Sequence, residues 1–266
     1  MKKKDKIITA ALFTGLLLPG IVRAEITGRK IQEKSIQATR LAGAESVAVM
    51  QIIDGKGRTR ERRIAQVSKL YDGGRIEKKL IRFLAPSDVK GTGFLTFDYR
   101  DESDDKWLFM PALRKSRRIV SSENAKSFMG SEFSYADITP PTVEDFRYTI
   151  LGEEDAAGVK CWKIEVIPLD DDTADENGYS KKIAFFGKAD FVLRRALYFD
   201  LDGELHKQLS VLEIKELDTV NHKYRPLHMV MENKRNGRKS ILKTEQIQFN
   251  PNVKDEYFTL RYLTRE

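Results

Sequence analysis

Alternation of apolar and polar residues runs through the chain from residue 46 onward. In residues 46–54, for example, Val47 and Val49 alternate with Ala48 and Met50. This two-residue period is typical of β-strands. Turn residues separate further runs of the same kind, and we predict strands at residues 46–54, 58–71, 75–84, 92–99, 106–110, 114–120, 159–167, 180–187, 190–200, 204–217, 224–235 and 238–249.

The remaining segments suit helices and loops. A sparse apolar stripe predicts a short helix over residues 28–41, and residues 255–260 form a terminal helix or turn. Residues 121–155, with Gly130, Pro140 and Pro141, are expected to be a loop with one or two short helices. Hairpin-length turns join nearly all the strands, so the fold class is mainly β with short helices (α+β). A flat sheet of about a dozen strands is disfavoured, so the sheet should curl into a barrel or half-barrel. Its interior needs filling by helices, a ligand or both.

The first 24 residues have the pattern of a cleavable signal peptide. Four lysines precede an apolar run from Ile7 to Val22, and Val22-Arg23-Ala24 suits cleavage after Ala24. The run is about 16 residues, shorter than the roughly 20 of a spanning helix, which disfavours an uncleaved anchor. It lacks a twin-arginine pair and a nearby cysteine. We therefore expect export through the Sec pathway to the periplasm, with residues 25–266 forming a single domain.

Charge and motifs narrow the function. Cleavage would remove five basic residues and one acidic residue, so the net charge would fall from +7 to +3, too little for a nucleic-acid footprint. The sequence lacks HExxH, CxxC, GxSxG and Walker-type motifs. The only cysteine, Cys161, lies in an alternating run and is expected to be a buried apolar residue. We predict that the protein is not an enzyme and uses no cofactor or metal.

Two features remain for binding. The first is a basic cluster on one predicted strand, Arg114, Lys115, Arg117 and Arg118. It suits either a solvated edge strand or a surface that docks to an acidic partner or to lipid head groups. The second is a density of aromatic residues between residues 94 and 148, which suits either ordinary core or the lining of a ligand cavity.

The stretch around these features resembles the LolA-like family of outer membrane lipoprotein-sorting proteins. The similarity lies in residues 106–120, in residues 127–137 and in Phe83 to Pro86 with Gly91 to Phe94. The second stretch fits the pattern Phe-x-Gly-Ser-x-Phe-x-Tyr-x-Asp through Phe128, Gly130, Ser131, Phe133, Tyr135 and Asp137. The motif is confined to about residues 81–152, while the organisation matches over essentially the whole mature chain.

The resemblance implies a half-barrel of about eleven antiparallel strands, closed by a lid of short helices, that carries lipoprotein acyl chains or lipids between the inner and outer membranes. It implies an inner-membrane transporter of the resistance-nodulation-division type or an outer-membrane acceptor as partner, transient membrane contact and a monomeric carrier. On residue type and position, we expect the apolar cavity and lid to include Phe94, Phe97, Trp107, Phe109, Phe128, Met129, Phe133 and Tyr135. Which strand face lines the cavity stays open, since a slip of one residue exchanges the faces.

Two alternatives follow from the same resemblance. An RseB-like periplasmic sensor would use the groove to detect lipid and would respond by binding a regulatory protein, but we expect this chain to lack the second domain of such regulators. A fixed accessory subunit of a transporter would co-purify with that transporter in constant stoichiometry.

Overall fold

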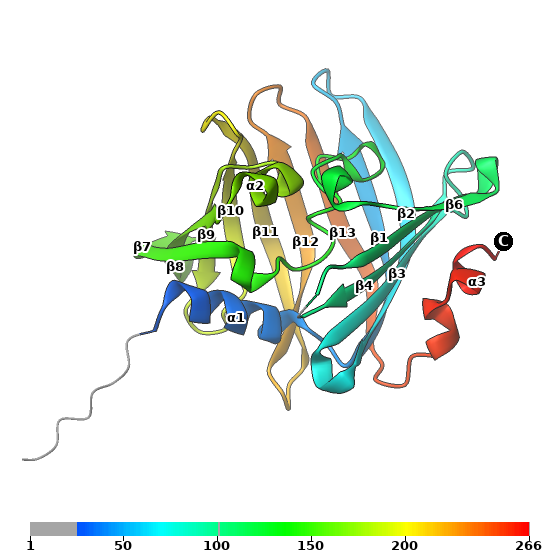
Figure 1. The fold of residues 1–266 in the computed structure, drawn as a ribbon, viewed down its shortest axis with the longest axis horizontal. Coiled ribbons are helices and arrows are strands. Elements are labelled where there is room, and N and C mark those ends of the chain that lie inside the picture. The colour runs from blue at the N-terminus through cyan, green and yellow to red at the C-terminus, as the bar shows by residue number, and fades with distance from the viewer. Residues whose placement is uncertain (1–25, 101, 266) are drawn as a thin grey trace, which may run out of the picture.

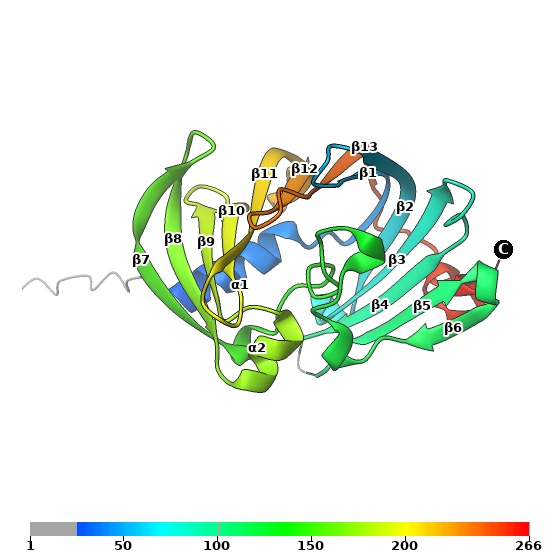
Figure 2. The same cartoon turned by 90° about the horizontal axis from the view of Figure 1, so that it is seen from above.

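The computed structural model describes residues 26–100 and 102–265. The predicted signal peptide, residues 1–24, lies outside them and stays a prediction. The described residues form a single open antiparallel sheet of 13 strands, curled into an arc (Figures 1 and 2). The strands are β1 Gly43–Ile53, β2 Thr59–Tyr71, β3 Ile76–Ala85, β4 Gly93–Tyr99, β5 Asp105–Met110, β6 Lys115–Arg118, β7 Phe146–Ala156, β8 Val159–Pro168, β9 Lys181–Gly187, β10 Leu193–Phe199, β11 Leu205–Asp218, β12 Lys223–Asn233 and β13 Lys239–Phe249.

The sheet consists of two meanders joined in the middle. Strands β1 to β6 pair in sequence order, as do β7 to β13, and β1 pairs with β13 along ten residue pairs that include Ser46 with Ile247. Consequently β6 and β7, which follow one another along the chain, are the two edges of the open sheet. Residues 119–145, here called the crossing segment, connect these edges. Figure 2 shows this segment inside the arc.

Helix α1, Gly28–Thr39, braces the concave side of the arc. The Thr27 side chain caps the helix by accepting a hydrogen bond from the Lys30 backbone N–H at 3.2 Å, and Ile31 and Ser35 are on its buried face. At one end, the position of a Gly28 Cβ would be only 3.0 Å from Cβ of Tyr148 on β7. Beyond the other end, Arg40 forms an ion pair with Asp98 on β4. The helix therefore reaches from one half of the sheet to the other.

The convex face of β3 to β5 is covered by the C-terminal residues. Helix α3, Leu260–Leu263, follows the 3₁₀ turn η6, Asp255–Phe258. The Arg82 guanidinium donates hydrogen bonds to the carbonyl oxygens of Tyr262 and Leu263 at 2.8 and 3.1 Å. A Cβ at position 93 would lie 2.7 Å from Leu263, so glycine permits this close packing. Strands β3 to β5 are thus buried on both faces.

The remaining elements are short. Helix α2 is Asp171–Asn177, and the other 3₁₀ turns are η1 Asp72–Gly74, η2 Pro111–Leu113, η3 Ser121–Glu123, η4 Phe128–Gly130 and η5 Val143–Asp145. None of the helices between residues 26 and 265 is long and apolar enough to cross a membrane.

The predicted strands are all present, usually within one or two residues of the expected ends, but two elements differ. Residues 146–156 form strand β7, whereas the sequence suggested loop or helix there. Their side chains are mostly exposed, and even the apolar Ile150 and Leu151 face solvent. The segment therefore lacks the regular alternation of buried and exposed side chains that is typical of a half-buried strand. Residues 171–177 form helix α2 in place of a turn, because the Asp170 carboxylate caps them by accepting from the Thr173 N–H at 2.7 Å.

Candidate functional site

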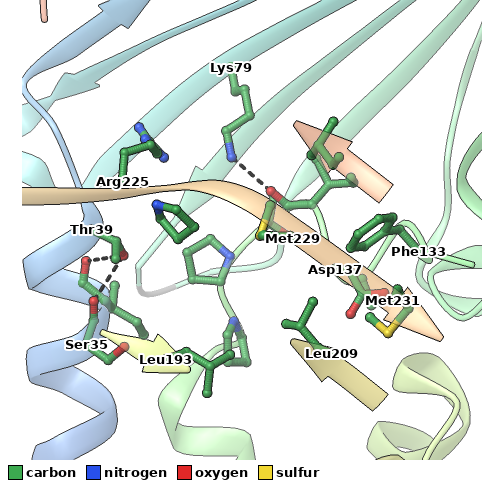
Figure 3. Close-up of a pocket in the computed structure, with 18 of the residues that line it drawn as sticks. Ser35, Thr39, Lys79, Phe133, Asp137, Leu193, Leu209, Arg225, Met229 and Met231 are labelled. Atoms are coloured by element: carbon green, nitrogen blue, oxygen red, sulfur yellow. Dashed lines mark hydrogen bonds between the residues drawn. The ribbon is translucent and has the colours of Figure 1, made fainter. Parts of the chain in front are cut away.

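A cavity of about 350 Å³ lies between the concave face of the sheet, helix α1 and the crossing segment (Figure 3). This volume falls within the range of about 300–1,000 Å³ that is usual for small-ligand pockets. Its walls come from both halves of the sheet, with β1 to β3 on one side and β9 to β13 on the other. The crossing segment contributes residues 133 and 136–141, as well as Phe128.

One end of the cavity is mainly apolar, although the side chain of Asp137 lies beside it (Figure 3). Phe133 of the crossing segment packs there against Leu209 on β11 and Met231 on β12, with Met229 and Leu242 beside them. Phe133 is only 6% exposed and Met231 is fully buried. Methionine is unbranched and flexible, so two methionines in the wall allow this end to adapt to ligands of different shape.

The opposite end is polar and lies against α1. Ser35 and Thr39 of the helix are found there, and Arg225 projects from the start of β12 (Figure 3). Glu77 and Lys79 on β3 are both buried, and the Lys79 Nζ donates to the Ile138 carbonyl oxygen of the crossing segment at 2.9 Å. The cavity therefore has an amphipathic lining, with an apolar end at Phe133 and a polar end at Arg225.

Charge in the lining is mainly positive. Four cationic residues, Arg40, Lys79, Lys182 and Arg225, line the cavity together with the acids Glu77 and Asp137. Burial lowers the pKa of Lys182 to about 8, although Asp137 acts in the opposite direction. Burial also lowers the pKa of Arg225, which nearby Glu77 opposes. These shifts arise because the enclosed site solvates a cation less well than water does.

A second cavity, of about 420 Å³, adjoins the polar end. The two cavities share Ile36, Arg40, Pro140 and Pro141 as lining residues. At their boundary Arg40 pairs with Asp98, which is 6% exposed, and burial raises the pKa of Asp98 to about 6 against the effect of Arg40. The second cavity extends along α1 as far as Lys223. The polar end of the first cavity is therefore the end that adjoins this second cavity.

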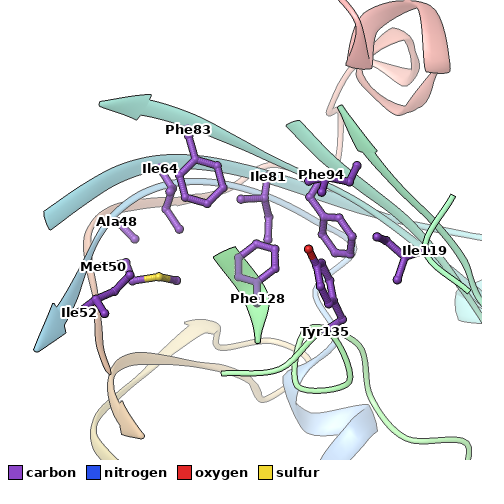
Figure 4. Packing of buried hydrophobic residues seen from close by; sticks show 11 residues of the cluster. Ala48, Met50, Ile52, Ile64, Ile81, Phe83, Phe94, Ile119, Phe128 and Tyr135 are labelled. Carbon is purple, nitrogen blue, oxygen red and sulfur yellow. The ribbon is translucent and has the colours of Figure 1, made fainter. Parts of the chain in front are cut away.

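Aromatic residues hold the crossing segment against the sheet (Figure 4). The ring of Phe128 is fully buried, with its centroid 5.3 Å from Phe94, 6.1 Å from Phe83 and 5.6 Å from Tyr135. Phe83 and Phe94 belong to strands β3 and β4, so these contacts cross from segment to sheet.

Hydrogen bonds fix the same segment at Glu132. Its backbone N–H donates to Ser240 Oγ at 2.8 Å, and its carboxylate is 2.8 Å from Nε of Arg238. Lys207 Nζ donates to the carbonyl oxygen of Glu132 at 3.0 Å. The crossing segment is thus attached to β3 and β4 by rings and to β11 and β13 by polar contacts.

The predicted cavity residues fall into three groups. Phe128 and Phe133 line the cavity. Phe94, Met129 and Tyr135 belong to the core between the crossing segment and the concave face, beside the cavity. Phe97, Trp107 and Phe109 pack on the other face of the sheet, against the C-terminal residues Phe258 and Leu263, and do not line it. Successive side chains of a strand point to opposite faces, so Phe94 and Leu95 lie on different faces of the sheet. Phe97 and Trp107, the cross-strand partner of Leu95, lie on the same face as Leu95 and therefore away from the cavity.

Sequence reasoning missed the contribution of the second meander. Leu209, Met229, Met231 and Leu242 line the apolar end, and Arg225 the polar end. The alternation in residues 204–217 and 224–235 could have indicated these lining residues, because in the second range it places Arg225, Met229 and Met231 on one face of the strand. What the pattern lacked was any indication that this face is the concave one.

The basic cluster lies at an edge of the sheet, where β6 pairs only with β5 among the described strands. All four of its residues are exposed. Arg117 forms an ion pair with Glu123 at 2.7 Å, and Arg118 pairs with Asp105. Arg114 and Lys115 have no ion pair within residues 26–100 and 102–265, so they carry most of the free charge of this edge. Cys161, as expected, is fully buried.

Comparison with known proteins agrees with this architecture. A family model described only as an uncharacterized protein matches residues 75–265. A DUF1329 family protein from Desulfovibrio piger is 29% identical, with a TM-score of 0.80 over 89% of this chain and 97% of its own. A putative outer membrane lipoprotein-sorting protein domain from Vibrio parahaemolyticus is 28% identical, with a TM-score of 0.80 over 90% of this chain and 98% of its own. The chain belongs to the family that this model describes, and its fold is similar to those of the DUF1329 family protein and the outer membrane lipoprotein-sorting protein domain.

A more distant structure extends the agreement in fold. A LolA superfamily protein from Nitrosomonas europaea is 18% identical and has a TM-score of 0.66, over 90% of this chain and all of its own. Among curated proteins, none matches the chain significantly. This likeness is one of fold, and the 13-strand sheet is the framework of that fold here.

Proposed function

We propose that this protein is a periplasmic carrier that binds lipoprotein acyl chains or lipids in its concave cavity and moves them between the inner and outer membranes. The observation that carries the proposal is the cavity itself, whose apolar end is built from Phe133, Leu209 and Met231. Each CH₂ group removed from water contributes roughly 0.8 kcal/mol, so a dry groove of this kind offsets the cost of extracting an acyl chain.

The crossing segment is proposed to be the lid of this carrier. It covers the concave face, and its attachments include the ring of Phe128, the backbone of Glu132 and the Ile138 carbonyl that accepts from Lys79. Gly130, with φ of +77°, lies between the lining residues Phe128 and Phe133, and Pro140 with Pro141 ends the lining run of residues 136–141. Opening at these points would admit a chain without unfolding the sheet.

The basic edge at β6 is proposed as the surface that docks to an acidic partner or to lipid head groups. Arg114 and Lys115 are its residues without an ion pair in the described part of the chain, and neither lines the cavity, so changing them should affect docking without affecting cargo binding. A transporter of the inner membrane and an acceptor at the outer membrane are the partners that a carrier of this family would meet.

The test begins with the protein purified from the periplasm. Solvent extraction and mass spectrometry should detect bound lipid, and the stripped protein should bind a fluorescent acyl probe. Phe133→Asp should weaken probe binding by at least tenfold, because it places a charge at the apolar end. Val220→Asp is the matched control, since Val220 is 85% exposed and outside the cavity. Absence of both lipid and probe binding in the wild-type protein would exclude the carrier function.

Transport needs a separate measurement. Donor vesicles with a labelled lipid and unlabelled acceptor vesicles should exchange label faster when the protein is present. Stable capture of one membrane protein in fixed stoichiometry, with no exchange between vesicles, would indicate a sensor or a transporter subunit in place of a carrier.

A further inference from the structure

The two ends of the cavity differ in chemistry, and the difference bears on which lipid the cavity accepts. Phe133, Leu209, Met229 and Met231 gather at one end, and Arg225, Ser35 and Thr39 at the other (Figure 3). A purely hydrocarbon ligand would leave the polar end without a partner. An amphiphile would match both ends if its polar head were next to α1.

Arg225 is the cation at the polar end whose charge is least compensated. Two other cations of the lining have fixed partners, since Arg40 pairs with Asp98 and Lys79 donates to the Ile138 carbonyl. Lys182 has the carboxylate of Asp137 as its charged neighbour. Within the described part of the chain, the Arg225 guanidinium has neither a hydrogen bond nor an ion pair, and its main charged neighbour is Glu77. A guanidinium presents a planar fork of donors that matches carboxylate and phosphate oxygens.

The carboxylate of Glu77, in the part of the chain that the structure describes, also lacks a hydrogen-bond partner at one of its oxygens. The residue is only 4% exposed, and its Oε1 atom is buried without a hydrogen-bond donor among the described residues. A buried carboxylate oxygen without a donor is costly, as is a partly buried guanidinium without an acceptor. A ligand group that brings an anionic oxygen to Arg225 and a hydrogen-bond donor to Glu77 would satisfy both.

This inference rests on the proposed carrier function and specifies its cargo. We propose that the cavity binds an amphiphile whose head group carries an anionic phosphate or carboxylate oxygen, held by Arg225 at the α1 end. Its acyl chain extends towards Phe133 and Met231. Neutral lipids of the same chain length are poorer ligands, because they leave the guanidinium unpaired.

The wild-type protein allows a first test. Three ligands with the same palmitoyl chain, namely palmitate, 1-palmitoyl lysophosphatidylethanolamine and 1-monopalmitoylglycerol, compete with a neutral fluorescent probe at pH 7. Palmitate and the lysophospholipid, which both carry an anionic oxygen, should displace the probe at concentrations at least about tenfold lower than monopalmitoylglycerol. Stronger displacement by the phospholipid identifies phosphate as the preferred group, and stronger displacement by palmitate identifies carboxylate. Equal displacement by all three ligands would overturn the proposal.

Variants then locate the subsite. Arg225→Met should weaken the binding of palmitate and of the lysophospholipid roughly tenfold to a hundredfold and change that of monopalmitoylglycerol by no more than about twofold. Arg147→Met makes the same change on exposed strand β7, outside the cavity, and should alter none of them. Glu77→Gln removes a negative charge near Arg225, so palmitate should bind at least as tightly as before.

The outcomes separate this proposal from the carrier function. If neither the probe nor any palmitoyl ligand binds to the wild-type protein, the carrier function itself fails. If all ligands bind and Arg225→Met weakens them equally, Arg225 has only a structural role and the head-group proposal fails alone. Because the wild-type preference is measured independently, the proposal can be refuted even if Arg225→Met does not fold.

Discussion

Replacing Phe128 by alanine should loosen the crossing segment and speed ligand exchange. The ring is fully buried among Phe83, Phe94 and Tyr135, with centroids 5.3 to 6.1 Å away. Phe→Ala changes at such core sites cost about 3–5 kcal/mol through lost burial and the remaining cavity. For a domain of this size each kcal/mol lowers Tm by about 2–4 °C, so Tm should fall by roughly 6–20 °C.

Phe109→Ala provides the matched control. Phe109 is 4% exposed and packs with Leu80, Leu95 and Leu263 on the convex face, so its loss of stability should be similar. Its effect on the cavity should be small, because the sheet separates it from the concave side. Stability is measured by urea denaturation, and exchange by stopped-flow release of a fluorescent acyl probe.

The two variants together decide whether the segment controls access. Phe128→Ala should release the probe several-fold faster than the wild type, while Phe109→Ala should release it at the wild-type rate. Equal acceleration in both variants would mean that exchange follows overall stability, and the assignment of the crossing segment as a lid would be refuted.

Three further predictions concern charge. Burial raises the pKa of Asp98 to about 6, above its unfolded value, so the folded state binds this proton more tightly and the free energy of unfolding should fall as pH rises from about 4 to 6. Asp98→Asn should remove this fall, which is at most about 3 kcal/mol, and urea titrations of the variant with the same pH dependence as the wild type would contradict this. Burial lowers the pKa of Lys182 to about 8, so holding this amine protonated in the folded state at pH 7 costs stability. Lys182→Met should therefore raise Tm at pH 7 and raise it less at pH 10.5, and an equal rise at both pH values would argue against the shift. Changing Arg114 and Lys115 to glutamate should slow lipid transfer to vesicles of anionic lipid at low salt and leave probe affinity unchanged; transfer at the wild-type rate would remove the basic edge from docking.

The course of the sheet could be predicted from the sequence, because its strands alternate and hairpin-length turns join them. The alternation in residues 46–54 and 238–249, for instance, gave strands that the structure places side by side as β1 and β13. The crossing segment could also be located, since it breaks the alternation and contains Gly130, Pro140 and Pro141. The family resemblance around Phe128 and Phe133 then pointed to residues that do touch the cavity.

The faces of β4 and β5 could not be predicted, and the reason is physical. Alternation reveals the inner face of a strand only when the other face meets water. Here Phe94 faces the crossing segment, whereas Leu95 and Phe109 are covered by the C-terminal residues, so apolar side chains occupy both faces. Strand β7 was missed for the opposite reason, since most of its side chains are exposed.

The seam between β1 and β13 also governs the order in which the protein can fold. Ser46 and Ile247 face each other there although about 200 residues separate them along the chain. Each meander can form through neighbouring hairpins, but this central pairing must close a very long loop, which is slow and entropically costly. Until it forms, β1 and β13 are unpaired edges of two half-sheets. The cavity, whose walls come from both halves, therefore cannot form before this pairing does.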